Sequence, residues 1–323
     1  MNNSLLTNKK GSSETIREAF NFNFYNYIQN KPEHIKIVDQ RFLEWFIGFT
    51  EGDGSFIIYS KKTETRKKMC FIINQDDYQL LFKIKKQLGF GQVTTYKQNN
   101  KLYYRYSVSY IENITRLIHL FNGNLILEKV QNRFSKWLTC YNNLYPNNYI
   151  EPKLFSPILS LNSAWLSGFI DAEGGFYASL TEQNNLKLKY RLRLKFYITQ
   201  KNEYELLKAI MKMFYFKYED YLISKPLISK VKTKKKLTLY NLDRYISRYS
   251  NIDRLEISTN ILMLVIIDYL TDYKLQGKKR ISFLRWKRIY LNKDILKNVS
   301  MKSKKSLKRF KKLVIAVNKK KKS

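Results

Sequence analysis

The chain contains one short sequence pattern twice, about 120 positions apart. The first copy occupies residues 46–54 (FIGFTEGDG) and the second occupies residues 166–174 (LSGFIDAEG). Each copy is an apolar stretch with small residues four positions apart, and each ends in two carboxylates and a glycine. A pattern this specific rarely occurs twice by chance. We therefore expect two similar halves, each of which supplies acidic groups to a common centre.

The small residues predict how the two halves meet. In the first copy Gly48 and Gly52 lie one helical turn apart, and in the second copy Gly168 and Ala172 do. Two helices whose facing surfaces are made of such small residues can bring their backbones unusually close together. We therefore expect the two motif helices to pack against each other at a pseudo-twofold axis.

The residues after each motif predict the same order of elements, αββαββα, in both halves. In the first half we expect helices at 41–52, 76–88, 114–121 and 125–138, strands at 55–59, 69–75 and 102–110, and a further strand before the last of these. In the second half we expect helices at 164–172, 203–214, 253–272 and 280–291, strands at 175–180 and 186–200, and a strand pair within 222–240. The fold class is therefore predicted to be α+β with an internal repeat.

Composition divides the chain into five segments. The predicted halves are 39–138 and 163–301, and the linker 139–162 between them holds three of the five prolines. Residues 1–38 are polar and aperiodic, which is typical of a flexible N-terminal arm. Residues 302–323 are dominated by lysine, which predicts a flexible tail with sequence-independent affinity for phosphates.

The charge balance points to a polyanionic partner. The chain has 60 Lys and Arg residues against 26 Asp and Glu residues, a formal net charge of +34, and such an excess favours binding to nucleic acid. A membrane surface is the alternative, but the sequence lacks a basic amphipathic helix with a clean apolar face. No apolar run reaches the roughly 18 residues of a membrane span. We therefore expect a soluble protein.

Few side chains are available for catalysis other than carboxylates and lysines. Cys70 and Cys140 lack the spacing of a zinc site, and His34 and His119 are the only histidines. Hard cations bound by oxygen ligands are the chemistry that remains. Frequent Asn, Lys, Ile and Tyr are what AT-rich codons would encode, which suggests synthesis inside an organelle.

Asp53 and Glu173 stand at the ends of the two motif helices. If these helices cross in parallel, both carboxylates lie together beside helix C-termini, where negative charges repel each other and attract cations. Mg²⁺ prefers carboxylate and backbone oxygens with room for water, and metal ions placed on a phosphate can activate water and stabilise a leaving oxygen. The motifs therefore predict a divalent-metal site.

With both motif copies and the matching element order, the chain resembles the single-chain LAGLIDADG homing endonucleases over residues 41–291. The resemblance implies two saddle-shaped antiparallel sheets packed by helices around a central two-helix interface, with the sheets astride a DNA duplex. It assigns Asp53 and Glu173, at the eighth motif position, to metal binding and catalysis. It makes Glu51 and Asp171, at the sixth position, structural.

Two further pairs of residues are implied to be catalytic. Gln75 and Gln200 each end a predicted strand just before a helix, and the resemblance places them where solvent is oriented near the metals. Lys129 and Lys278 each precede a Phe by five positions and a Trp by eight, and the resemblance gives them contact with water or the scissile phosphate. A capping Gln and a solvated Lys are the ordinary alternatives, and Lys279 competes with its neighbour. We favour Lys278 over Lys129.

A basic strand predicts the DNA-binding face. In residues 187–195, period-two alternation puts five cations on one face and apolar residues on the other, and such a β-ribbon fits the major groove. A solvated hairpin explains the cations of 61–67 equally well. The candidate DNA-binding residues are Lys61, Lys62, Arg66, Lys67, Arg105, Lys187, Lys189, Arg191, Arg193, Lys195, Lys230, Lys232 and Lys234.

The resemblance implies site-specific cleavage of double-stranded DNA at a long, poorly palindromic target, as in intron homing, by a monomer with an internal pseudo-dimer. The implied cofactor is Mg²⁺ or another divalent cation such as Mn²⁺, and the implied location is the mitochondrial matrix. The alternative is an RNA maturase that assists splicing of a group I intron, with or without retained DNA cleavage. A nonenzymatic DNA-binding protein is a third interpretation, although both acids are present.

Overall fold

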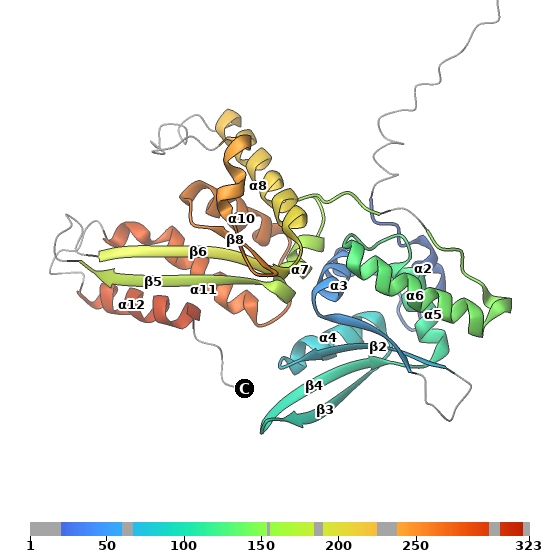
Figure 1. Cartoon of the computed structure of the whole chain (residues 1–323). Coiled ribbons are helices and arrows are strands. Elements are labelled where there is room, and N and C mark those ends of the chain that lie inside the picture. The colour runs from blue at the N-terminus through green and yellow to red at the C-terminus, as the bar shows by residue number, and fades with distance from the viewer. Residues whose placement is uncertain are drawn as a thin grey trace, which may run out of the picture.

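The computed structural model describes residues 21–59, 67–153, 156–183, 190–224, 238–296 and 304–318. Figure 1 shows two α+β halves that meet at a pair of short helices. Each half contains one four-stranded antiparallel sheet, with the strand order β1-β2-β4-β3 in the first and β5-β6-β8-β7 in the second. The α+β class and the repeat of two halves are thus confirmed.

The first half follows the predicted order of elements closely. Asp39 caps the first motif helix by accepting a hydrogen bond from the backbone N–H of Phe42, and Gly89 ends a later helix in the left-handed conformation, at φ +80°. The elements are α3 (Gln40–Asp53), β1 (Gly54–Tyr59), β2 (Lys68–Gln75), α4 (Tyr78–Leu88), β3 (Gln92–Gln98), β4 (Lys101–Val108), α5 (Ile111–Phe121) and α6 (Glu128–Leu144).

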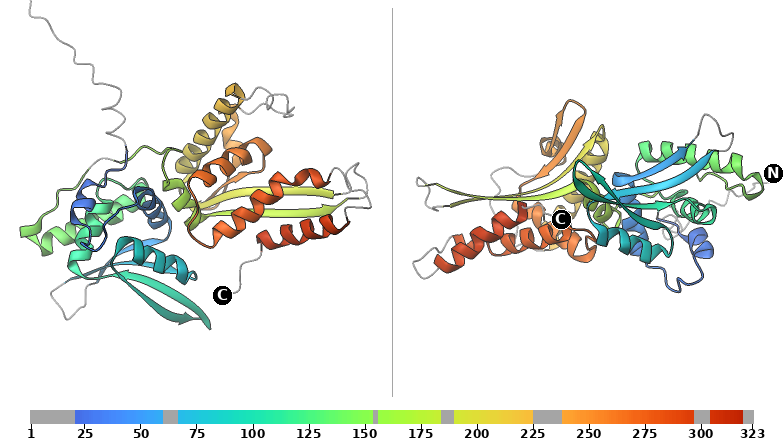
Figure 2. Two further views of the ribbon diagram at one scale, coloured as in Figure 1. Left: turned by 180° about the vertical axis from the view of Figure 1, so that it is seen from behind. Right: turned by 90° about the horizontal axis from the view of Figure 1, so that it is seen from below.

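The second half repeats this order and adds a helix at its end. Its elements are α7 (Trp165–Glu173), β5 (Gly174–Glu182), β6 (Tyr190–Lys201), α8 (Tyr204–Ser224), β7 (Ile246–Tyr249), β8 (Ile252–Ile257), α10 (Asn260–Asp272), α11 (Lys279–Leu291) and α12 (Lys304–Asn318). Helices α11 and α12 both pack on β5, and Figure 2 shows this half from two further sides.

The two motif helices, α3 and α7, pack against each other as predicted. A Cβ atom built on Gly48 would lie 2.0 Å from the carbonyl oxygen of Trp165, and one built on Gly168 would lie 1.8 Å from that of Trp45. Real side chains do not approach this closely, so only glycine fits at either position. The small residues therefore set the distance between the two halves.

Equivalent aromatic clusters fill the two cores. In the first half, Phe56 lies 5.2 Å from Trp137 and 5.5 Å from Phe134 between ring centroids. In the second half, Phe176 lies 5.5 Å from Trp286 and 5.4 Å from Phe283. The Phe and Trp that follow each candidate lysine by five and eight positions are therefore core residues. They fix α6, which contains Lys129, and α11, which Lys278 directly precedes.

The predicted position of the last strand pair was wrong. The pair that completes the second sheet is β7 and β8, which follow the expected range 222–240. Residues 222–224 end helix α8, and 225–237 lie outside the described residues. The segment expected to begin a helix at 253 starts as β8, which pairs with β6 from Phe196 opposite Ile257 to Lys201 opposite Ile252. Burial alternates along β8 as in a strand. The strand is so short that its residues could not be distinguished in the sequence from the apolar helix that follows.

Parts of the two terminal segments are ordered on the halves. The short helix α2 (Tyr25–Asn30) buries Tyr27 and packs on α5, which differs from the flexible arm expected for 1–38. Helix α12 differs likewise from the flexible tail expected for 302–323, because it packs on α11 and β5. Its buried residues Phe310, Val314 and Val317 recur every three to four positions among the lysines, which is the period of an amphipathic helix.

Candidate active site

The two motif helices end side by side, and their last residues are the acids Asp53 and Glu173. A Cβ built on Gly52 would lie 3.0 Å from Cγ of Glu173, so the Glu173 side chain passes over the end of the opposite helix. Burial raises the pKa of both carboxyl groups, and the charge of Asp53 raises that of Glu173 further. The structure thus brings the two predicted metal-binding acids into one electrostatic centre.

Each acid has a glutamine beside it. Antiparallel pairing sets Gly54 opposite Ile73 and Gly174 opposite Ile198, so the glutamine two residues further along each strand reaches the end of the motif helix. Gln75 donates to Oδ2 of Asp53 at 2.7 Å, and Gln200 lies close enough to Glu173 for its side chain to oppose the rise in the pKa of that acid. Both predicted glutamines therefore hold the orientation of an acid.

Lys129 lies in the first half, but it contacts groups of the second. Its ammonium donates to Oε1 of Gln200 at 2.8 Å and forms an ion pair with Glu203, with 3.2 Å between Nζ and Oε1. Its charge also opposes the rise in the pKa of Glu173. The structure therefore places this lysine at the Glu173 side of the site.

Lys278 makes the reciprocal crossing, from the second half to the first. Its ammonium donates to the carbonyl oxygen of Asp76 at 2.6 Å and lies 3.5 Å from Oδ1 of that residue. Its backbone N–H donates to Oδ2 of Asp77 at 3.0 Å. Lys278 is therefore held by Asp76 and Asp77, the two aspartates that directly follow Gln75 in the sequence.

Lys279 is the site residue that sequence reasoning did not select. Its ammonium donates to the carbonyl oxygens of Ala172 at 2.6 Å and Ile170 at 3.3 Å, at the C-terminal end of α7. Its charge opposes the rise in the pKa of both Asp53 and Glu173. The sequence signal for this residue was the presence of two adjacent lysines, at 278 and 279, where the first half has only one. The position that corresponds to Lys279 in the first half is the buried Val130.

The sixth-position acids have structural contacts. Glu51 accepts from the backbone N–H groups of Ile126 and Leu127 at 2.7 Å each and from the indole of Trp165. Asp171 accepts from the backbone of Gln276 at 2.6 Å. It also accepts from the indole N–H of Trp45 at 3.0 Å, so each acid binds a tryptophan of the opposite half.

Burial of these two acids predicts a pH-dependent stability. It raises the pKa of Glu51 to about 7 and that of Asp171 to about 6, above the ordinary values of 4.5 and 3.8. Because the folded state binds these protons more tightly than the unfolded state, stability is greatest below the ordinary pKa values and falls as the pH rises through the raised ones.

We expect the free energy of unfolding in urea to decrease between about pH 4 and pH 7, by about 1.4 kcal/mol for each unit by which a pKa is raised. Glu51→Gln should flatten this decrease, and Glu112→Gln, which changes an exposed acid, should leave it unchanged. An equal slope in all three proteins would contradict the prediction.

The basic strand has the expected alternation where the structure describes it. In β6, Arg191 and Arg193 are exposed, and Leu194 between the cations is buried. Lys195 is on the same face and pairs with Glu256 at 2.6 Å. In the first half, Arg105 donates to Oδ1 of Asn74 at 2.9 Å, and Lys67 is exposed. Lys61, Lys62, Arg66, Lys187, Lys189, Lys230, Lys232 and Lys234 lie outside the described residues.

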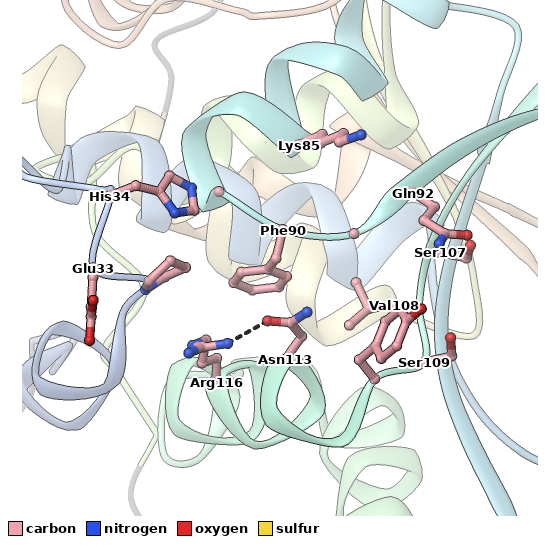
Figure 3. A pocket seen from close by; sticks show the side chains of 14 residues that line it. Glu33, His34, Lys85, Phe90, Gln92, Ser107, Val108, Ser109, Asn113 and Arg116 are labelled. Atoms are coloured by element: carbon pink, nitrogen blue, oxygen red, sulfur yellow. Dashed lines mark hydrogen bonds between the residues drawn. The ribbon is translucent and has the colours of Figure 1, made fainter.

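A separate surface pocket of about 640 Å³ lies in the first half. It is lined by His34, Lys85 and Arg116, among others, and Figure 3 shows Arg116 turned toward Asn113, to which it is hydrogen-bonded. The pocket residues include neither Asp53 nor Glu173. It therefore has no part in the chemistry of the two acids.

The oxygen atoms at the helix ends fit a hard divalent cation. Within the described ranges, no group of three or more His, Cys, Asp and Glu side chains could hold a metal ion. The acids at the helix ends are two carboxylates, Asp53 and Glu173, and Mg²⁺ in proteins is commonly bound by one or two carboxylates together with water and phosphate. This is the ligand set that Mg²⁺ favours. No helix in the described part of the chain is both long and apolar enough to cross a membrane.

Comparison with known proteins gives consistent matches. The model of the LAGLIDADG endonuclease family matches residues 46–141 and 166–290. A Neurospora crassa protein named probable intron-encoded endonuclease 4 is 32% identical over 285 residues, which is 87% of this chain and 43% of that protein. The intron-encoded RNA maturase bI4 of Saccharomyces cerevisiae is 30% identical over 218 residues, which is 62% of this chain and 31% of the maturase. The chain thus spans less than half the length of either relative.

A solved structure shares the fold. The LAGLIDADG meganuclease I-CpaMI, bound to uncleaved DNA, matches with a TM-score of 0.59 at 18% identity, over 86% of this chain and 99% of that one. Fold and site together define a pseudo-dimeric α+β protein with paired acids where its motif helices meet. The chain belongs to the LAGLIDADG endonuclease family.

Proposed function

We propose that the protein is a site-specific endonuclease that cleaves double-stranded DNA during intron homing. The observation that carries this proposal is the pair of acids at the ends of α3 and α7, each with a glutamine of a neighbouring strand beside it. Asp53 and Glu173 each serve one DNA strand. The basic faces of the two sheets bind the duplex, and one chain provides both half-sites as a monomer.

The cofactor proposed is Mg²⁺, which Mn²⁺ can replace. Asp53 and Glu173 are the residues that would hold it, and when bound it supplies positive charge that activates water and stabilises the leaving oxygen. Gln75 and Gln200 fix the rotamers of the two acids. Lys129 supplies a positive charge near Glu173, and Lys279 supplies one that acts on both acids, where charge develops on the phosphate.

Mitochondrial synthesis is proposed for this chain. The support is the frequent use of residues encoded by AT-rich codons and a match to a relative whose name describes it as intron-encoded. The target would then be an uninterrupted copy of the gene that contains the intron.

An RNA maturase is the second candidate function. It is favoured by the match to the yeast maturase and by the net charge of +34, which suits RNA as well as DNA.

One experiment tests the proposal against this alternative. The purified protein is incubated with Mg²⁺ and the intronless form of the host gene, with EDTA as the metal-free control, and in parallel with the precursor RNA. Metal-dependent cleavage at one site is expected. No cleavage together with faster splicing of the RNA would replace the endonuclease with a maturase.

The exposed arginines of β6 are expected to determine target preference. Arg191→Ala and Arg193→Ala should each relax the preference at one or two base pairs and cost about 1–3 kcal/mol of binding there, because arginine reads guanine edges in the major groove. Binding of the variants to a library of targets measures this effect. Lys308→Ala, which changes an exposed lysine of α12, is the control, and equal weakening on all sequences by the arginine variants would contradict base reading.

A further inference from the structure

The ammonium of Lys129 is fixed by two groups of the opposite half. Gln200 accepts from it at 2.8 Å, and Glu203 pairs with it at 3.2 Å. Gln200 also acts on Glu173, because its side chain opposes the rise in the pKa of that acid, so the lysine, the glutamine and the acid lie close together. The Glu203 side chain is 17% exposed and the Lys129 side chain 39% exposed, so this ion pair is partly shielded from water.

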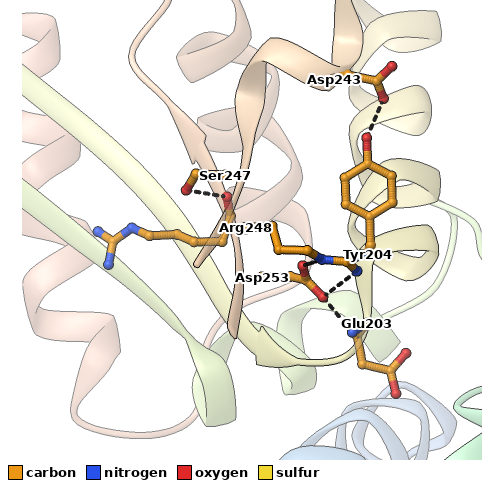
Figure 4. A network of polar contacts seen from close by, with 7 residues as sticks. Glu203, Tyr204, Asp243, Ser247, Arg248 and Asp253 are labelled. Atoms are coloured by element: carbon orange, nitrogen blue, oxygen red, sulfur yellow. Dashed lines mark hydrogen bonds and ion pairs between the residues drawn. The ribbon is translucent and has the colours of Figure 1, made fainter. Parts of the chain in front are cut away.

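The backbone of Glu203 is itself held in place by a buried carboxylate. Asp253 on β8 is fully buried and accepts from the backbone N–H of Glu203 at 2.9 Å. Arg248 donates to the same carboxylate at 2.5 and 3.1 Å, and its guanidinium lies 5.0 Å from the ring centroid of Tyr204. Figure 4 shows the group, with Arg248 and the start of α8 converging on Asp253.

The sheet register explains why these groups coincide. Asp253 stands opposite Gln200 on one side and opposite Arg248 on the other. The same residue of β8 therefore lies opposite Gln200 of β6 and holds the backbone of Glu203, the residue before α8. Both contacts of Lys129 are thus set by the sheet of the second half.

We propose that Glu203 is a positioning residue, which holds the ammonium of Lys129 against Gln200 and so keeps it beside Glu173. Without the Glu203 carboxylate, a long lysine side chain with 39% exposure would turn into solvent and lose its place at the acid. This inference rests on the proposed endonuclease function and concerns only the strand that Glu173 serves.

The first half has a different arrangement, which makes the role of Glu203 specific to one half-site. Lys278 is held by the carbonyl and carboxylate oxygens of Asp76, and Asp77 accepts from its backbone while it caps α4 at Leu80. Lys279, whose charge acts on Asp53, is held by the carbonyl oxygens at the end of α7. Removal of the Glu203 carboxylate therefore leaves these two lysines of the second half in place.

The test measures the nicking of each strand separately. A duplex target is labelled on one strand at a time, and Glu173→Gln identifies the strand that depends on Glu173. Glu203→Gln should slow the nicking of that strand by about tenfold or more, the loss typical of residues that orient a catalytic group, while the other strand and the Kd for DNA stay unchanged. Glu205→Gln, which removes an exposed acid in the first turn of α8, two residues after Glu203, should change neither rate.

A double variant shows whether Glu203 acts through Lys129. If it does, Lys129→Met with Glu203→Gln should be no slower than Lys129→Met alone. Additive losses, or equal slowing of both strands, would overturn the positioning role, because either result means a general structural effect. If Glu203→Gln nicks both strands as fast as the wild-type protein does, the positioning role is refuted but the endonuclease proposal is not. A wild-type protein that cuts neither strand would refute the endonuclease proposal itself.

Discussion

Asp53→Asn and Glu173→Gln are each expected to abolish double-strand cleavage and to leave at most one strand nicked. Each substitution removes a negative charge that would hold the metal at one strand, and a loss of about 4 kcal/mol in transition-state stabilisation slows that strand on the order of a thousandfold. DNA binding without metal should be equal or slightly tighter, because a carboxylate that repels phosphate has been removed.

Separation of nicked and linear plasmid products on a gel, with binding measured in EDTA, tests this expectation. Glu112→Gln, which neutralises an exposed acid on α5, is the control for the change in charge. Wild-type rates of double-strand cleavage in either variant would show that the acids at the ends of α3 and α7 are not the catalytic ones.

The second large effect concerns the contact between the halves. Gly168→Ala should destabilise the protein by about 3 kcal/mol or more, because the added methyl group would lie 1.8 Å from the carbonyl oxygen of Trp45 and must push the two helix backbones apart. Gly48→Ala should behave in the same way, since its methyl group would lie 2.0 Å from the carbonyl oxygen of Trp165.

Urea denaturation measures the loss, and Ser167→Ala supplies a matched control on the same helix. The hydroxyl of Ser167 is buried without a hydrogen-bond partner among the described residues, so its removal should cost little. A midpoint for Gly168→Ala equal to that of Ser167→Ala would show that α3 and α7 tolerate a wider spacing than the structure has.

The repeat could be predicted because its evidence is local. The small residues of the motifs stand at helical spacing, and the alternation of residues 191–195 has the period of a strand. The strands β7 and β8 could not be located in the same way, since they have four and six residues and lead directly into an apolar helix. In α12, three buried apolar residues were hidden among many lysines.

The candidate site was predictable in its members but not in its connections. Asp53 and Glu173 follow from the motif, whereas the contact of Lys129 with Gln200 joins residues 71 positions apart in different halves. Only tertiary structure shows such a crossing. The same reason explains Lys279, whose role comes from the carbonyl oxygens at the end of α7 and not from any spacing along the chain.

The exchange of tryptophan and carboxylate partners has a consequence for the modularity of the chain. Trp45 donates to Asp171 and Trp165 donates to Glu51, so each half supplies the hydrogen-bond donor for a buried acid of the opposite half. In a chimera that joins one half of this chain to the opposite half of a related protein, the indole and the buried acid of this half would need a matching acid and a matching indole in the related half. Interchangeable halves therefore require that both reciprocal pairs match, and recombination of target specificities is limited by four side chains that are buried at the contact between the halves.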